Sequence, residues 1–305
     1  MTLPAGGGPP FVVGIDAGAT KTVALLADDK GRILAQARGG GANLHVQGEA
    51  QVEGVLRALL AELSQIAAPA RLCVGMAGLD RPHDEEVVRE ILARIGYAGR
   101  LRLANDALIA LVAGAPPARV GIVVLSGTGS IAYGVDPGGT IARSGGFGSL
   151  LGDEGSGYWL GNHALRAVVR ASDGRGPSTA LTPMVFEALA VASVDELVPL
   201  VYEHHLPRSA VAALAGRVER ARAQGDGVAS ELLGRAAQEL VLAGQAVARK
   251  LHFDKPHPVV LAGGVFQACP SLARMVTDRL GLPLARPSVL DREPAHGAVA
   301  LALEL

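Results

Sequence analysis

Three acidic residues in this sequence stand where a carboxylate could bind a metal ion or accept a proton. Asp16 ends the β-branched run FVVGID and is followed by the glycine turn AGATKT. Asp106 ends a second apolar run, LRLAND, and a helix-forming stretch follows it. Asp153 lies among the glycines of GGFGSLLGDEGSGYWLG, residues 145 to 161. Ligand sites in open α/β sheets form outside the carboxyl ends of the strands, which is where Asp16 and Asp106 are expected.

Each acid also has an ordinary structural interpretation. Asp16 could hydrogen-bond only its own turn, and Asn105 or Asp106 could cap the helix that follows them. Asp153 and Glu154 are adjacent in the sequence, and the side chains of adjacent residues seldom point at the same atom. We expect Asp153 to face a ligand and Glu154 to brace the loop or the start of the next helix.

Two glycine turns follow apolar runs, GIDAGATKT and LSGTGS. The first is not a P-loop, because Thr20 replaces the glycine before Lys21 and a strand follows where a P-loop needs a helix. The second is not a dinucleotide fingerprint, because its third glycine is displaced to Gly134. Both remain turns whose backbone N–H groups could approach phosphate oxygens.

The two turns belong to a repeated pattern of strand, glycine turn, strand, turn and strand. Asp16 aligns with Ser126 at an offset of 110 residues, and Ile33 aligns with Ile141 at an offset of 108. The pattern predicts two homologous lobes, although chance similarity between two glycine-rich hairpins would give the same alignment.

Helices and strands alternate around these hairpins, which predicts a partly parallel sheet covered on both faces. The expected helices and strands lie at residues 49 to 66, 71 to 78, 84 to 95, 101 to 106, 258 to 266 and 296 to 305, with a mostly helical region from 156 to 253.

Composition limits the kinds of partner. The 305 residues are 49% hydrophobic, enough for the cores of two domains, and the net charge of -1 excludes the basic footprint of a nucleic-acid or anionic-membrane protein. Cys73 and Cys269 form no CxxC motif and are expected to be reduced core thiols. The opening MTLPAGGGPP has no signal-peptide pattern, so a cytoplasmic location is expected, and a homodimer is a reasonable expectation for a soluble enzyme.

Taken in order, these motifs resemble a known superfamily. The first glycine turn, the strand-end Asp106, LSGTGS, LAGGVF and the terminal HGAVALA resemble actin, sugar kinases and Hsp70. GGFG and GDEGS resemble more closely the N-acetylglucosamine kinase group of the BadF/BadG/BcrA/BcrD-type ATPase family. The resemblance implies an α/β, two-lobed actin-like ATPase (ribonuclease H-like) fold with duplicated mixed β-sheet domains and a cleft between them. It places one lobe at residues 9–114 plus 291–305 and the other at 115–290.

The same resemblance implies an ATP-dependent kinase that phosphorylates the 6-OH of N-acetylglucosamine or glucosamine. Asp106 would be the general base, and Asp16 would hold Mg²⁺ through water. The residues implied to bind ATP are Gly18, Thr20, Lys21, Gly127, Thr128, Gly129, Gly263 and Gly264. The residues implied to contact the sugar are Asn43, Ser130, Gly146, Phe147 and Asp153, with Phe147 in place of the family's Trp.

Two other functions fit the same fold. An ATP-hydrolysing activator of an Fe–S dehydratase or reductase needs thiolate ligands in a local motif, which Cys73 and Cys269 do not form. A non-catalytic sugar-binding regulator would carry a helix-turn-helix module before the first strand, which here begins near Phe11. The zinc motif of ROK-type sugar kinases is also missing from the sequence.

Overall fold

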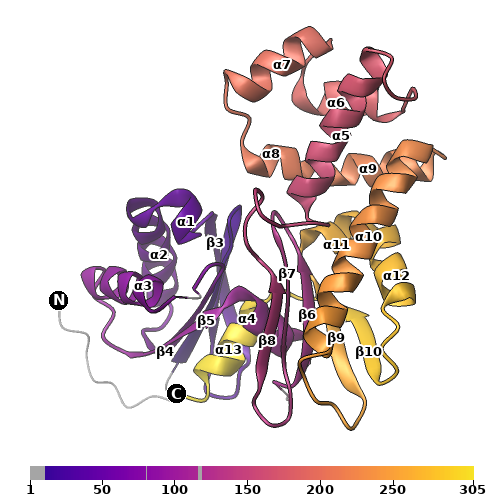
Figure 1. The fold of residues 1–305 in the computed structure, drawn as a ribbon. Coiled ribbons are helices and arrows are strands. Elements are labelled where there is room, and N and C mark those ends of the chain that lie inside the picture. The colour runs from indigo at the N-terminus through magenta and orange to yellow at the C-terminus, as the bar shows by residue number, and fades with distance from the viewer. Residues whose placement is uncertain (1–10, 80, 116–118) are drawn as a thin grey trace. The chain divides into compact units, whose positions relative to one another are not determined.

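The chain is described by a computed structural model for residues 11–79, 81–115 and 119–305. The expected start of the first lobe at residue 9 lies outside the described residues. The chain divides into two compact units, one formed by Met1–Gly121 with Leu290–Leu305 and the other by Ile122–Val289 (Figure 1). We call them unit 1 and unit 2.

Unit 1 is built on a five-stranded sheet in the order β3-β2-β1-β4-β5. β1 pairs antiparallel with β2 and parallel with β4, and β4 pairs parallel with β5. The carboxyl ends of β1, β4 and β5 therefore meet at one edge of the sheet. The strands are β1 (Phe11–Ala17), β2 (Lys21–Ala27), β3 (Ile33–Gly40), β4 (Pro69–Met76) and β5 (Arg100–Asn105).

Helices cover both faces of this sheet (Figure 1). Successive residues of a strand face opposite sides, so Val13 packs with α2 and α3 while Val12 packs with α4 and α13. A Cβ at Gly14 would lie 2.3 Å from the backbone nitrogen of Val299, so the glycine lets α13 approach β1 closely. The helices are α1 (Leu44–Gln47), α2 (Glu49–Ser64), α3 (Pro82–Arg94), α4 (Asp106–Gly114) and α13 (Ala295–Ala302).

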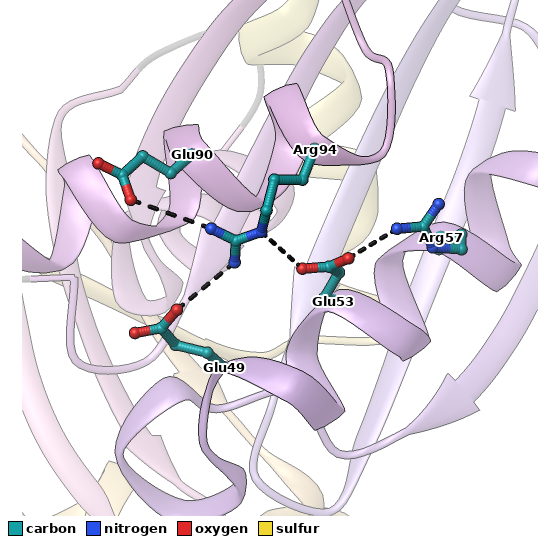
Figure 2. A network of polar contacts seen from close by, with 5 residues as sticks. All are labelled: Glu49, Glu53, Arg57, Glu90 and Arg94. Atoms are coloured by element: carbon teal, nitrogen blue, oxygen red, sulfur yellow. Dashed lines mark hydrogen bonds and ion pairs between the residues drawn. The ribbon is translucent and has the colours of Figure 1, made fainter.

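An ion-pair network joins α2 to α3 on the surface of unit 1 (Figure 2). Glu53 accepts hydrogen bonds from Arg57 at 2.6 Å and from Arg94 at 2.8 Å. Arg94 also lies 3.4 Å from Glu49 and 3.9 Å from Glu90. Two cations therefore share the one carboxylate of Glu53.

Unit 2 repeats the topology of unit 1. Its sheet has the order β10-β9-β6-β7-β8, which read from the other end is the order of the first sheet. The expected duplication of mixed β-sheets is confirmed, and the α/β class with it. The strands are β6 (Gly121–Ser126), β7 (Ser130–Val135), β8 (Ile141–Gly145), β9 (His257–Ala262) and β10 (Ala285–Val289), the last of which the sequence analysis missed.

The remaining helices belong to unit 2. All except α8, which contacts α5, contribute to one hydrophobic core with the sheet. The longest, α10, contacts β7, β8 and α12. Among the described residues, no helix is both long enough and apolar enough to cross a bilayer. The helices are α5 (Gly157–Ser172), α6 (Leu181–Leu189), α7 (Val194–Tyr202), α8 (Arg208–Ala213), α9 (Ala215–Ala223), α10 (Gly227–Ala248), α11 (Gly264–Ala268) and α12 (Pro270–Arg279).

Candidate functional site

The turn between β1 and β2 is held in place by the segment just before α1 and by the last residue of α1. Gly18 donates its N–H to the Lys21 carbonyl at 3.0 Å, which closes the turn. The Gly18 carbonyl accepts from Ala42 at 3.0 Å, and the Ala19 carbonyl accepts from the Gln47 amide at 2.6 Å. The turn is therefore fixed in shape before any ligand arrives.

Asp16 and Asp106 occupy the shared carboxyl edge of the unit 1 sheet. Asp16 lies at the end of β1, and Asp106 is the first residue of α4, directly after β5. Burial, reinforced by the negative charge of Asp106, raises the pKa of Asp16 from its ordinary 3.8 to about 7, while Lys21 acts in the opposite direction. The charge of Asp106 therefore disfavours ionisation of Asp16, and a bound cation would offset this repulsion.

The helix cap at α4 is Asn105, whose side-chain oxygen accepts from the Ala107 N–H at 2.8 Å. Asp106 Oδ1 accepts from the same N–H at 2.9 Å. This contact orients the Asp106 carboxyl group at the helix start, and the cap does not depend on it.

A pair of cations shares one carboxylate beside the first turn. Lys21 Nζ donates to Glu293 Oε2 at 2.9 Å and to Oε1 at 3.2 Å, and Arg38 donates to Oε1 at 2.9 Å. Burial alone would raise the pKa of Glu293, but the hydrogen bonds and charges of Lys21 and Arg38 hold it below its ordinary value. Glu293 is therefore an anion that two cations surround.

Asn43 lies in the same unit and is 9% exposed. Its side-chain oxygen caps α1 by accepting from His45 N–H at 3.0 Å, and its amide nitrogen donates to the Ala77 carbonyl at 3.3 Å. His45 in turn lies 3.4 Å from the buried carboxylate of Asp84. Asn43 thus has structural partners on both atoms of its amide.

The turn between β6 and β7 in unit 2 is fixed by the start of α5. Gly127 donates to the Gly129 carbonyl at 2.9 Å within the turn. The carbonyls of Gly127 and Thr128 accept from Gly157 at 2.8 Å and Tyr158 at 3.4 Å, the first two residues of α5. The first helical N–H groups, which have no partner within a helix, thus bind the turn.

Asp153 lies against this second turn. Its carboxylate accepts from the Ser130 backbone N–H at 3.2 Å and from Arg208 at 3.2 Å. Burial raises the pKa of Asp153, while the Ser130 and Arg208 contacts act against the rise. Asp153 has a φ of 62°, and a Cβ at Gly129 would lie 2.9 Å from its Oδ1, so a glycine there gives the carboxylate room.

Ser130 and Glu154 are joined through the backbone. The Ser130 hydroxyl donates to the Glu154 carbonyl at 2.8 Å, while the Glu154 side chain is exposed. The helix cap is Ser156, which accepts from the Trp159 N–H at 3.1 Å. Glu154 therefore holds the loop through its main chain, and its exposed side chain lies two residues before the Ser156 cap of α5.

Phe147 lines a pocket of about 380 Å³ in unit 2, and Gly146 directly precedes it in the chain. Phe147 is 64% exposed, and the Arg143 guanidinium lies 5.4 Å from its ring centre. Gly146 has a φ of 74°, and a Cβ there would lie 2.9 Å from the Ile131 side chain. The pocket is lined by residues of β7, β8, the 147–154 loop and α10, including Ser130, Ser144, Leu151, Glu154, Glu239, Ala243 and Arg249.

Gly263 and Gly264 follow β9 and differ in their surroundings. Gly263 has a φ of 104°, and a Cβ there would lie 2.2 Å from the Ser126 carbonyl oxygen. A Cβ at Gly264 would meet nothing within 4 Å. Packing within the chain therefore requires Gly263, whereas Gly264 borders open space.

The two cysteines are buried and belong to different units. Both are buried free thiols, and burial raises the pKa of each to about 12. Cys73 lies in unit 1 and Cys269 in unit 2. Within the described ranges, no group of three or more His, Cys, Asp or Glu side chains is arranged to hold a metal.

Comparison with known proteins identifies the family. The model of the BadF/BadG/BcrA/BcrD ATPase family matches residues 13–302. The chain belongs to this family. An N-acetylmuramic acid/N-acetylglucosamine kinase of Clostridium acetobutylicum is 34% identical over 300 residues, with 96% of this chain and 98% of the relative covered. An N-acetyl-D-glucosamine kinase of Dictyostelium discoideum is 30% identical over 309 residues, with coverages of 95% and 97%.

Solved structures agree with this assignment. A Chromobacterium violaceum protein provisionally named an N-acetylglucosamine kinase superposes with a TM-score of 0.76 at 30% identity, covering 97% of this chain and 99% of its own. A ROK family glucokinase of Streptomyces griseus, solved with glucose and AMPPNP, shares the fold with a TM-score of 0.62 at 21% identity, with coverages of 96% and 98%.

In this BadF/BadG/BcrA/BcrD family member, the expected site residues fall into two groups. Unit 1 contains Asp16, Gly18, Thr20, Lys21, Asn43 and Asp106, and unit 2 contains Gly127, Thr128, Gly129, Ser130, Gly146, Phe147, Asp153, Gly263 and Gly264. The sequence analysis missed Glu293, Arg38 and Arg208. Glu293 is 272 positions from Lys21, and no local motif signals such a contact.

Proposed function

We propose that this protein is an ATP-dependent kinase that transfers a phosphoryl group to the 6-OH of an amino sugar, either N-acetylglucosamine or glucosamine. Its family and two relatives named as N-acetylglucosamine kinases support the assignment. The name of the Clostridium relative adds N-acetylmuramic acid as a further acceptor. The observation that carries the proposal is the pair of carboxyl groups, Asp16 and Asp106, at the shared strand edge beside the fixed glycine turn.

Asp106 is the proposed general base. A sugar hydroxyl attacks phosphorus more readily when its proton has an acceptor within hydrogen-bond reach. Asp106 is oriented at the start of α4 by the Ala107 N–H, and its charge reaches Asp16 at the end of β1. In this role Asp106 takes the hydroxyl proton as the bond from the sugar oxygen to the γ-phosphorus forms and the bond from that phosphorus to the departing ADP breaks.

Asp16 is the proposed Mg²⁺ contact, through water. The high pKa of Asp16 reflects a desolvated carboxylate close to a second one, an environment that suits a divalent cation. Because the described residues offer no cluster of three ligands, most of the coordination would come from water and phosphate oxygens, as is usual for Mg²⁺. The bound ion would neutralise charge on the transferred phosphoryl group.

The nucleotide is assigned to the two glycine turns and the segment after β9. Gly18, Thr20 and Lys21 belong to the first turn, and Gly127, Thr128 and Gly129 to the second. Backbone N–H groups in such turns are suited to phosphate oxygens. Both turns are fixed by hydrogen bonds from neighbouring segments, so little ordering is needed when the phosphates bind. Gly263 and Gly264 are the proposed neighbours of the adenosine.

The acceptor sugar is assigned to Asn43 in unit 1 and to Ser130, Gly146, Phe147 and Asp153 in unit 2. The Asp153 carboxylate would accept hydrogen bonds from sugar hydroxyls in addition to those from Ser130 and Arg208. Phe147 offers an exposed ring edge beside the pocket, which suits the apolar face of a sugar or an N-acetyl methyl group.

A panel of acceptors tests this function. ATP consumption is measured with N-acetylglucosamine, glucosamine, N-acetylmuramic acid and glucose, and the product is examined for a phosphate at the 6-position. Amino sugars should stimulate ATP consumption well above the rate without sugar. Equal rates with and without every sugar would overturn the proposal.

Asp106→Asn tests the general base. The variant keeps the size of the side chain and an acceptor oxygen for the Ala107 N–H, so the protein should still fold and bind the sugar. Turnover should fall by about 10²- to 10⁴-fold. A near-normal rate in this variant would exclude Asp106 as the base.

A further inference from the structure

The contact between Lys21 and Glu293 joins the first glycine turn to the far end of the chain. Lys21 is the first residue of β2, and its ammonium reaches both carboxylate oxygens of Glu293 at 2.9 and 3.2 Å. Arg38, on the adjacent strand β3, binds the same carboxylate at 2.9 Å. Two cations therefore share this one carboxylate.

Glu293 stands on a rigid support. It lies just before α13, and its carbonyl accepts from the His296 N–H at 3.0 Å. Helix α13 is fixed against the sheet and α4, because a Cβ at Gly14 or at Gly297 would lie 2.3 and 1.9 Å from backbone atoms of Val299 and Ile109. The backbone of Glu293 is therefore held by the fold independently of Lys21.

Arg38 is also held on its other side. With its amide turned so that the oxygen faces Arg38, Gln36 accepts from Arg38 Nε at 2.6 Å and from Nη2 at 2.7 Å. The Arg38 guanidinium therefore keeps the Glu293 carboxylate ionised and oriented. The carboxylate is in turn directed at Lys21.

This contact contributes little to stability. The side chains of Lys21 and Arg38 are 58% and 56% exposed, and ion pairs at such exposure are weak because water screens them and long side chains lose entropy. The contact has a larger effect on where the Lys21 ammonium lies. Lysine carries a point charge on a flexible stem, so a fixed anion that captures the ammonium removes most of its conformational freedom in advance.

We propose that Glu293 is a positioning residue for Lys21: it holds the ammonium beside the first turn, where the ammonium meets the phosphates of a bound nucleoside triphosphate. This inference rests on the proposed function. An ammonium group has three N–H donors, and the two Glu293 oxygens leave it able to donate to a phosphate oxygen as well. Arg38 supports Glu293 from the other side and acts through it.

The test is a double-mutant cycle on nucleotide binding, which needs no sugar and no turnover. The affinity for AMPPNP with Mg²⁺ is measured by calorimetry in the wild type, Glu293→Ala, Lys21→Ala and the double variant. Glu293→Ala should weaken binding by about 3- to 10-fold, the factor for ordering one long side chain on binding. Once Lys21 is gone, removing Glu293 should have no further effect.

Glu53→Ala is the matched control. Glu53 also holds two cations with one carboxylate, and its side chain is 23% exposed, the same as that of Glu293 (Figure 2). If removal of any shared surface carboxylate weakened nucleotide binding, Glu53→Ala and Glu293→Ala would both lose affinity. Nucleotide affinity in Glu53→Ala should equal that of the wild type.

Steady-state kinetics give a second readout. Glu293→Ala should raise the KM for ATP and leave the KM for the sugar unchanged, while Glu293→Gln, which keeps an acceptor oxygen without the charge, should fall between it and the wild type. Glu293→Gln also serves if the alanine variant fails to fold.

Each outcome has a distinct meaning. Wild-type or tighter nucleotide binding in Glu293→Ala would overturn this inference, since it would mean that Glu293 is idle or competes with phosphate for Lys21. Independent effects of Glu293→Ala and Lys21→Ala would also overturn it. A wild-type protein that binds nucleotide but phosphorylates no amino sugar would overturn the proposed function alone, and one that binds no nucleotide would overturn both.

Discussion

The raised pKa of Asp16 predicts that the unliganded protein loses stability as the pH rises towards 8. Below about pH 4, Asp16 is protonated in both the folded and the unfolded chain, so it adds no pH dependence to the free energy of unfolding. Between its ordinary 3.8 and about 7, the unfolded chain releases the proton while the folded protein keeps it. The folded state then binds more protons than the unfolded state, so stability falls with increasing pH across this window.

Asp16→Asn removes this dependence because the amide does not ionise. The shift of about three units, at about 1.4 kcal/mol each, gives a difference on the order of 4 kcal/mol. The variant should therefore match the wild type near pH 4 and be more stable by up to that amount at pH 8. The free energy of unfolding is measured by urea titration with circular dichroism between pH 4 and 8, with EDTA present.

Asp28→Asn provides a control of opposite sign. Asp28 follows β2 in the same sheet, and the backbone N–H and guanidinium of Arg32 together with the N–H of Lys30 hold its pKa below the ordinary value. Its contribution is present above about pH 4 and is lost as the pH falls, so the asparagine variant should be less stable than the wild type at pH 8. If Asp16→Asn differs from the wild type by the same free energy at pH 4.5 and at pH 8, the burial argument for Asp16 is incorrect.

Three further predictions concern single contacts. Gly263→Ala should destabilise the protein by several kcal/mol or prevent folding, because of its positive φ and the close carbonyl, while Gly264→Ala should cost about 1 kcal/mol or less in thermal unfolding. Arg208→Ala leaves the buried Asp153 carboxylate without its cation and should lower the free energy of unfolding by about 1–3 kcal/mol at pH 8. The loss should be smaller near pH 4, and urea titrations at both pH values can check this. Asn105→Ala removes the α4 cap and should cost about 1 kcal/mol in the same titration; an unchanged midpoint would mean that Asp106 replaces the cap.

The sequence predicted the parts of the fold that local pattern determines. Alternating apolar runs and glycine turns placed both hairpins, and the offset of 110 residues between Asp16 and Ser126 corresponds to equivalent strand ends in the two sheets. Strand β10 (Ala285–Val289) was missed because its residues ARPSV are mostly polar or partly exposed. Its strand character comes from parallel pairing with β9, which local sequence does not encode.

The sequence could not predict which charged groups meet. Asp153 and Arg208 are 55 positions apart and lie on different elements, and Lys21 and Glu293 are at opposite ends of the chain. Residue type and spacing identify a candidate carboxylate, but the cation that sets its pKa comes from tertiary packing. The signal that could have directed attention to Glu293 is its place just before a small-residue helix that had to pack against the first strand.

The two glycines after β9 have the same residue type for different reasons. The sequence resemblance implies that Gly263 and Gly264 both bind ATP. The Ser126 carbonyl already excludes a side chain at Gly263, so the need for glycine there follows from the fold alone. Gly264 borders open space, and no contact within the described chain requires it to be glycine. Of the two, only Gly264 can therefore report on a ligand: if Gly264→Ala leaves stability intact but weakens nucleotide binding, the space beside it belongs to the nucleotide.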